Sequence, residues 1–451
     1  MKKKRYLSSL IFLFAVWLST HAQIPSTALE AYIQKEDQSH VWEVVEVQTY
    51  NDCKVYSIFL ISQKWQDMLW KHELTLYVPD ALSHAEGVLL FITGGDLDEN
   101  RMVRFSDRSD KISQSISEIA LSNQAPTAVL RQVPNQPLYG HLKEDALIAH
   151  TLNQFRETSD YTSPLLFPMV KSVVKAMDTL EEFLKIKQGK SVKNFLISGI
   201  SKRGWTTWLT AATQDPRVVA IAPMVIEMLN FPEFFKSQYL AYGDFSEKIG
   251  DYVKLNIPQA LESDFGKQVV EMIDPYSYLD KITIPKLIVM GTNDPYWTID
   301  AIQNYIHQIP GTCLLHYVPN TGHNVGDKDS TFDALSAFFY HILHKEEYPA
   351  YSWQLNQKRK ITLDVNYLTS RLNAIKLWQA TSLTRDFRKS EWSSTSIDLR
   401  QKKNKVKVVV EYPQEGYKAF FVELECQSPI GGTYTLCTSA YVADTRQVFI
   451  K

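Results

Sequence analysis

Residues 195–205 predict a strand, a sharp turn and a helix, with Ser201 at the turn. A short apolar run leads to the serine, and a helix-compatible stretch rich in Trp, Thr, Leu and Ala follows it. Gly199, two positions before the serine, is small enough to let the strand and the helix approach each other. Arg203 stands two positions after the serine, and the next glycine comes one later, at Gly204. The segment is therefore either an ordinary strand-to-helix turn or a turn that exposes a reactive serine.

Two downstream segments add an acid and a histidine. Residues 285–291 form a buried-type strand followed by Asp294, and residues 314–318 form a strand followed by a Gly-His loop that carries His323. A serine hydroxyl is a poor nucleophile until an imidazole takes its proton, and the imidazole needs a carboxylate to fix its tautomer. The order Ser201, Asp294, His323, each just past a strand, is that of the α/β-hydrolase fold. Taken alone, Asp294 is typical of a turn residue and His323 of a loop residue. Together with Ser201, they predict a catalytic triad.

A third segment offers donors for an oxyanion hole. Residues 87–93 predict a core strand, which is followed by Gly94, Gly95 and Asp96. In α/β-hydrolases, the oxyanion is bound by a backbone N–H from the loop after an early strand and by the N–H that follows the nucleophile. We therefore expect donors at the N–H groups of Gly95 or Asp96 and of Lys202. The alternative is an ordinary Gly-Gly turn.

Several long segments resemble the PhoPQ-activated pathogenicity-related proteins. The resemblance extends from about residue 30 to about residue 440 and is carried by residues 132–138, 144–149, 198–212, 221–225, 317–323, 376–381 and 385–388. It implies a secreted α/β-hydrolase fold whose substrate is not generally established. Because the family includes a secreted repressor of cell proliferation, it also leaves open a signalling role without turnover. The acid loop departs from the expected pattern, since Asp294 is the only acid in residues 293–297.

The chain begins with a segment typical of a secretory signal peptide. Residues 1–22 hold a basic start, an apolar run at 7–18 and a Thr-His-Ala end, so we expect cleavage after Ala22 and a secreted or periplasmic protein. The apolar run is too short to span a membrane, so we expect no stable membrane insertion after cleavage; a retained interfacial anchor is the alternative. Cleavage leaves 44 basic and 50 acidic residues, a net charge near −6. Nucleic-acid binding is not expected, because it requires a basic face.

Disulfide pairing is open, and no metal or cofactor is expected. The four cysteines allow three pairings in an exported chain: Cys53, Cys313, Cys426 and Cys437. The last two flank a Pro-Ile-Gly-Gly segment and either face each other across a hairpin or are buried free thiols. The sequence contains no Cys/His cluster with metal-ligand spacing, no phosphate loop and no dinucleotide fingerprint.

Strand and helix patterns alternate through residues 23–347, which we predict to form an α/β-hydrolase domain. Antiparallel edge strands are expected first, at residues 41–47, 55–61 and 74–78. Further strands are expected at residues 88–93, 127–133, 195–198, 218–225, 286–290 and 313–318. Helical patterns separate several of them, at about residues 168–187, 205–213 and 330–343. This alternation predicts a mostly parallel sheet covered on both faces.

An aromatic-rich insertion at about residues 227–283 suits a cap over the active site. The alternative, favoured for most of these aromatics, is that they form the cap's own core. Gln132, Gln136 and Trp297 are expected to line a substrate pocket, because they lie near predicted strand ends. Residues 348–451 hold short strands separated by polar segments and predict a small all-β, sandwich-like domain.

These features favour a secreted serine hydrolase, an esterase or peptidase with a small-molecule, carbohydrate-ester or peptide substrate. Ser201 is the expected nucleophile, His323 the general base and acid, and Asp294 the orienting carboxylate. The basic residue after the serine, Lys202, is similar to that of uronic-ester carbohydrate esterases, which adds a sugar ester as one possible substrate. The competing hypothesis is a secreted signalling or binding protein that keeps the fold without physiological turnover.

Overall fold

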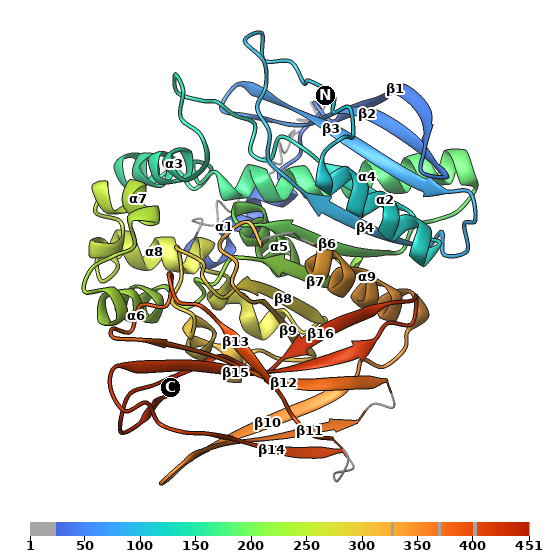
Figure 1. The fold of residues 1–451 in the computed structure, drawn as a ribbon. Coiled ribbons are helices and arrows are strands. Elements are labelled where there is room, and N and C mark those ends of the chain that lie inside the picture. Colours follow the sequence, from blue (N-terminus) through green and yellow to red (C-terminus); the bar gives the residue numbers. More distant parts are fainter. Residues whose placement is uncertain (1–23, 326–328, 369–370, 400–403, 451) are drawn as a thin grey trace, which may run out of the picture.

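The structure, a computed structural model, describes residues 24–325, 329–368, 371–399 and 404–450 (Figure 1). The predicted signal peptide at residues 1–22 lies outside the described residues. In the ranges that are described, no helix has both the length and the apolar character needed to cross a membrane.

A nine-stranded mixed sheet forms the centre of the described fold, in the order β1-β2-β3-β5-β4-β6-β7-β8-β9. The first three strands are antiparallel, β5 runs opposite to β3, and the strands from β5 to β9 are parallel to one another. The strand bounds are β1 Val41–Tyr50, β2 Cys53–Trp65, β3 Met68–Pro79, β4 Gly87–Ile92, β5 Thr127–Leu130, β6 Asn194–Ile200, β7 Val218–Met224, β8 Lys286–Gly291 and β9 Cys313–Val318. The predicted parallel sheet with an antiparallel edge is present.

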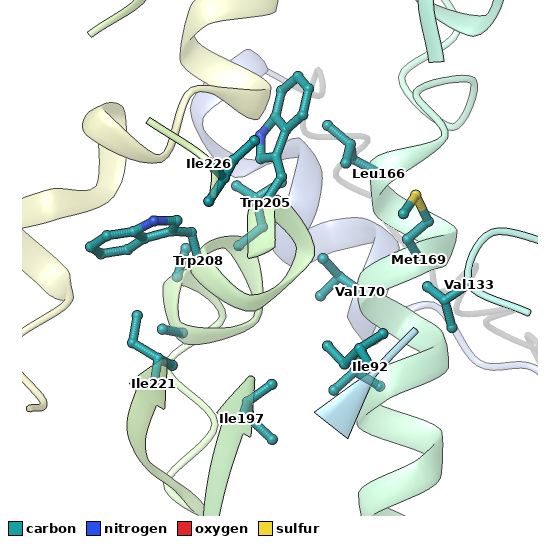
Figure 2. Close-up of a cluster of buried hydrophobic side chains, with 14 of the residues drawn as sticks. Ile92, Val133, Leu166, Met169, Val170, Ile197, Trp205, Trp208, Ile221 and Ile226 are labelled. Atoms are coloured by element: carbon teal, nitrogen blue, oxygen red, sulfur yellow. The ribbon is translucent and has the colours of Figure 1, made fainter. Parts of the chain in front are cut away.

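Helices cover both faces of this sheet (Figure 1). Successive side chains of β4 point to opposite faces, so Leu90 and Ile92 belong to one buried cluster while Leu89 and Phe91 belong to another. The first cluster packs under α4 and α5, where Figure 2 shows Ile221 near Trp208 and Ile92 beside Val170. The second packs under α2 and α9. The helix bounds are α1 Pro25–Gln34, α2 Lys111–Asn123, α3 Glu144–Thr158, α4 Leu166–Gln188, α5 Lys202–Ala212 and α9 Asp329–His344.

The predicted cap insertion is helical. It contains α6 (Phe231–Tyr242), α7 (Gly250–Lys254) and α8 (Asp264–Ile273), with short 3₁₀ turns between them at Glu247–Ile249 and Pro258–Ala260 and a longer 3₁₀ segment, Pro275–Lys281, after α8. Figure 1 shows the three helices and α3 gathered at one end of the sheet. Two further 3₁₀ turns, Ala301–Asn304 and Ile306–Gln308, lie between β8 and β9.

The C-terminal region consists of two packed sheets. A three-stranded sheet has the order β10-β11-β14, and a six-stranded sheet has the order β13-β12-β15-β17-β18 with β16 also paired to β15. Their facing side chains form a third buried cluster. The bounds are β10 Ala350–Gln357, β11 Ile361–Leu368, β12 Leu372–Ser382, β13 Ser393–Ser396, β14 Lys405–Val410, β15 Tyr417–Gln427, β16 Thr433–Cys437, β17 Tyr441–Ala443 and β18 Val448–Phe449. The predicted fold class, an α/β-hydrolase fold with a cap followed by a β-sandwich-like region, is confirmed.

The two parts of the chain share one core. The outer face of the six-stranded sheet packs on the first part, with the ring centroids of Phe421 and Tyr317 4.8 Å apart. The four cysteines are free thiols. Cys426 pairs across the strands with Tyr434, and Cys437 with Glu423, so the hairpin disulfide weighed above does not form.

Candidate active site

Ser201 occupies a tight turn between β6 and α5, with φ 60° and ψ −123°. Such a conformation is strained for a residue with a side chain and is typical of functional turns. Both neighbouring glycines are required by close contacts. A Cβ at Gly199 would lie 2.7 Å from the Arg203 Cβ, and a Cβ at Gly204 would lie 2.8 Å from the carbonyl oxygen of Met224. Gly204 therefore stands one position later than the second glycine of the usual Gly-x-Ser-x-Gly motif, because α5 packs closely against the end of β7 at that position.

The side chains of Ser201, His323 and Asp294 form one hydrogen-bonded chain. The Nε2 of His323 lies 2.7 Å from the Ser201 Oγ, and its Nδ1 lies 2.8 Å from an Asp294 carboxylate oxygen. The other carboxylate oxygen accepts the backbone N–H of Tyr296 at 2.9 Å. Ser201 is 8% exposed and Asp294 4%, so both are shielded from water. With a neutral imidazole, the serine hydroxyl donates to Nε2 and the Nδ1–H donates to Asp294.

The loops that carry the acid and the histidine are in direct contact. They follow β8 and β9, which are neighbours in the sheet. The backbone N–H of Asn293 donates to the carbonyl of Thr321 at 2.8 Å. A Cβ at Gly291 would lie only 2.5 Å from the carbonyl oxygen of Gly322, so the crossing of the two loops requires glycine there. This crossing brings residues 294 and 323 together although 29 positions separate them.

The loop predicted to bind the oxyanion lies against the helix that begins at Lys202. Gly95 has φ 129°, a backbone conformation that favours glycine. A Cβ at Gly94 would lie 2.4 Å from an Arg203 guanidinium nitrogen. The N–H of Lys202 belongs to the first turn of α5, where N–H groups have no acceptor within the helix. The oxyanion role of Gly95, Asp96 and Lys202 stays a prediction.

Of the three residues predicted to line a substrate pocket, only Trp297 borders the cavity beside Ser201. Gln132 accepts the N–H of Glu73 at 2.8 Å, and Gln136 donates to and accepts from Glu144. Both glutamines are buried and hold the backbone around the oxyanion loop. Their substrate-binding role therefore draws no support from the cavity lining.

The two cations after the serine are each bonded to a carboxylate of α3. Arg203 forms a two-pronged pair with Glu144, at 2.6 and 2.7 Å, and its Nε donates to the carbonyl of Val133. Lys202 lies 2.8 Å from Asp145. Burial alone would raise the pKa of Glu144, but the hydrogen bonds and charge of Arg203, with the charge of Lys202, lower it to about 2. Arg203 thus connects the serine turn, the oxyanion loop and α3.

We expect Arg203→Leu to destabilise the protein by about 2 kcal/mol at pH 7. Removing one partner of a buried pair costs about 3–5 kcal/mol, and the value is lowered here because the Glu144 side chain is 35% exposed. A carboxyl whose folded pKa is depressed stabilises the protein above its unfolded pKa, and that contribution is lost as the pH falls towards 2. Denaturant unfolding at several pH values should therefore show the deficit shrinking below about pH 4. The exposed Arg104, changed to Leu, is the matched control, and an equal deficit at pH 3 and pH 7 would contradict this account.

A loop from the C-terminal region is hydrogen-bonded to the two loops that carry Asp294 and His323, a contact that the sequence analysis missed. The side chain of Asn293 donates to three carbonyls of residues 383–392, the shortest being that of Ser390 at 2.7 Å. The Asn320 amide accepts the N–H of Trp392 at 2.7 Å and donates to its carbonyl at 2.9 Å. The family-like segments at residues 317–323 and 385–388 were the available signal, because the first includes Asn320 and the second includes two of the carbonyls that accept from Asn293.

For the serine hydrolase that the sequence predicts, Asn293→Ala is expected to lower kcat about tenfold with little change in KM, because small misplacements of catalytic groups cost up to about 10²-fold. The acid loop would lose its attachment to residues 383–392 while the serine and the cavity stay in place. Steady-state kinetics on an ester substrate measure the effect. Asn373→Ala, at an exposed position of β12, is the control. Wild-type kcat in a folded Asn293→Ala protein would show that the attachment does not position the acid.

Comparisons with known proteins identify a family and a relative that is similar over nearly the whole chain. The sequence profile described as PhoPQ-activated pathogenicity-related protein matches residues 29–388. The chain is similar to autocrine proliferation repressor protein A of Dictyostelium discoideum, with 29% identity over 476 aligned positions that cover 96% of this chain and 93% of the relative.

Solved structures of similar shape include acetyl xylan esterase 1 from a Thermoanaerobacterium species, with a TM-score of 0.47 and 14% identity over 71% of this chain and 92% of that one. A glucuronoyl esterase from Solibacter usitatus has a TM-score of 0.42 and 13% identity, over 70% of this chain and 91% of that one. An S-formylglutathione hydrolase from Agrobacterium tumefaciens also has a TM-score of 0.42, with 12% identity over 67% of this chain and 98% of that one.

Proposed function

The chain belongs to the PhoPQ-activated pathogenicity-related protein family, and on that premise we propose that it is an exported serine hydrolase that cleaves ester or amide bonds. The observation that carries the proposal is the pair of short contacts through His323, 2.7 Å to the Ser201 Oγ and 2.8 Å to Asp294. These are the distances at which an imidazole can take the serine proton while a carboxylate steadies its charge.

In the proposed reaction, the Ser201 Oγ attacks the carbonyl carbon of the substrate as its proton passes to the His323 Nε2. The oxygen of the tetrahedral intermediate takes the negative charge, facing the N–H groups of Lys202 and of Gly95 or Asp96. His323 then gives its proton to the leaving alcohol or amine, which leaves an acyl group on the serine. Water, deprotonated by the same imidazole, attacks the acyl carbon. The bond to the Ser201 Oγ then breaks, the Oγ takes the proton back from His323, and the carboxylic acid is released. Asp294 holds the imidazole tautomer throughout.

Export is proposed from the signal-peptide pattern at residues 1–22. The mature chain would begin at Gln23 in a secreted or periplasmic location. N-terminal sequencing of the exported protein tests this directly, and a mature chain that still begins at Met1 would contradict it.

A second candidate function is a secreted signalling protein without turnover. The observation that favours it is the similarity to a protein named an autocrine proliferation repressor. Steady turnover of p-nitrophenyl butyrate by the purified chain, blocked by phenylmethylsulfonyl fluoride, would favour the hydrolase. Folded protein that hydrolyses neither simple esters nor peptide anilides would favour the signalling role.

A further inference from the structure

A cavity opens beside Ser201, between α5 and the cap helices. Its walls are mostly aliphatic and aromatic. Trp205 contributes from α5, Phe234 from α6 and Val269 from α8, and the loop after β8 adds Trp297. The aromatics of the cap thus do more than form its own core, since several of them face this space.

The charged groups in the wall neutralise each other. The Asp145 carboxylate is bonded to Lys202 at 2.8 Å and accepts the hydroxyls of Tyr252 at 3.0 Å and Tyr296 at 3.3 Å. The ammonium of Lys202 also lies 3.6 Å from Glu144. A half-buried carboxylate with three donors has little capacity left for a ligand. The cation is likewise occupied, so the wall offers an acidic substrate no unshared positive charge.

Tyr296 connects the cavity to the reacting atoms. Its ring centroid lies 4.1 Å from that of His323, and its hydroxyl reaches the Asp145 carboxylate. A substrate carbonyl held at the Ser201 Oγ would therefore direct one of its two substituents into the apolar space.

We propose that this cavity binds an uncharged, apolar substituent of the substrate, an aryl group or an acyl or alkoxy chain longer than that of an acetate or ethyl ester. The inference rests on the proposed hydrolase function and narrows its substrate class. Each buried methylene favours binding by up to about fourfold, so several methylenes give a large preference over an acetate ester. A uronic ester, whose sugar is polar on every side, would leave these walls unused.

The test compares kcat/KM for p-nitrophenyl acetate, butyrate, hexanoate and phenylacetate, together with the acetates of ethanol, hexanol and benzyl alcohol. We expect at least a tenfold rise in one of the two series, and that series shows whether the acyl or the alcohol side enters the cavity. Val269→Phe, which fills the space, should reduce the preference several-fold. Ile249→Ala, which enlarges it, should move the optimum to longer chains and serves if the first variant does not fold. Ile186→Phe, at a position 63% exposed on α4, is the matched control.

Failure of this inference differs from failure of the proposed function. Acetate turnover with no rise in either series would overturn the inference and leave the hydrolase. If no ester is turned over, the cavity is still tested by thermal shift with hexanamide and acetamide on the Ser201→Ala protein. Stabilisation by hexanamide alone would support an apolar site, and equal responses to the two amides would overturn it.

Discussion

Ser201→Ala is expected to lower ester turnover by on the order of a millionfold, the loss measured when the nucleophile of another serine hydrolase is removed. Without the Oγ there is no group to form the acyl-enzyme, and the His323 imidazole at 2.7 Å has nothing to activate except water. The fold should lose about 1 kcal/mol or less, since one hydrogen bond disappears. Steady-state kinetics and thermal unfolding of the same preparation measure both effects.

Ser198→Ala provides the matched control for that experiment. This serine lies three residues earlier on β6, is fully buried, and donates to the carbonyl of Ala222 at 2.7 Å. Its loss should cost about 1 kcal/mol of stability and leave turnover within a few-fold of wild type. If Ser201→Ala keeps more than a small fraction of the wild-type rate, the proposed nucleophile is wrong.

Asp294→Asn is expected to lower kcat about 10⁴-fold with KM little changed, the size of loss seen for this substitution in a serine protease. The amide can offer its NH₂ group to the His323 Nδ1, which would favour the tautomer that carries its proton on Nε2. An Nε2–H cannot accept the serine proton. The amide oxygen can still accept a hydrogen bond from the backbone N–H of Tyr296, so the loop should keep its shape.

Glu227 supplies the control for the acid, because it is a second buried carboxyl close to the site. It lies just beyond β7 and accepts the hydroxyl of Tyr305. Burial, with the charge of Asp294, raises the pKa of Glu227 to about 8, so at pH 7 this carboxyl is mostly protonated. Glu227→Gln keeps a neutral group of the same shape and should change kcat only a few-fold. A large loss in Glu227→Gln with little loss in Asp294→Asn would exchange their roles.

The convergence of three side chains that follow strand ends could be predicted from the sequence. Ser201, Asp294 and His323 could be placed because parallel strands bring their carboxyl ends to one edge, and the fold places function there. The shifted glycine at Gly204 seemed a departure, yet its position is set by the contact of α5 with Met224. Only the packed structure shows that contact.

Contacts between distant segments could not be predicted from local patterns. Arg203 pairs with Glu144, 59 residues away, and Asn293 with a loop nearly a hundred residues later. For Gln132 and Gln136, closeness to a strand end did not reveal that their amides are bonded within the protein. Cap aromatics such as Phe234 were ambiguous for another reason. One face of such a ring can pack in the cap while the other lines a cavity.

The central claim is that Ser201 is an activated nucleophile, and covalent labelling tests it without knowledge of the substrate. The folded chain would be treated with a fluorophosphonate probe, and the labelled position mapped by peptide mass spectrometry. We predict a single adduct on Ser201 that is absent from Ser201→Ala and strongly reduced in Asp294→Asn. Folded protein that remains unlabelled, or that carries the adduct on another residue, would contradict the account.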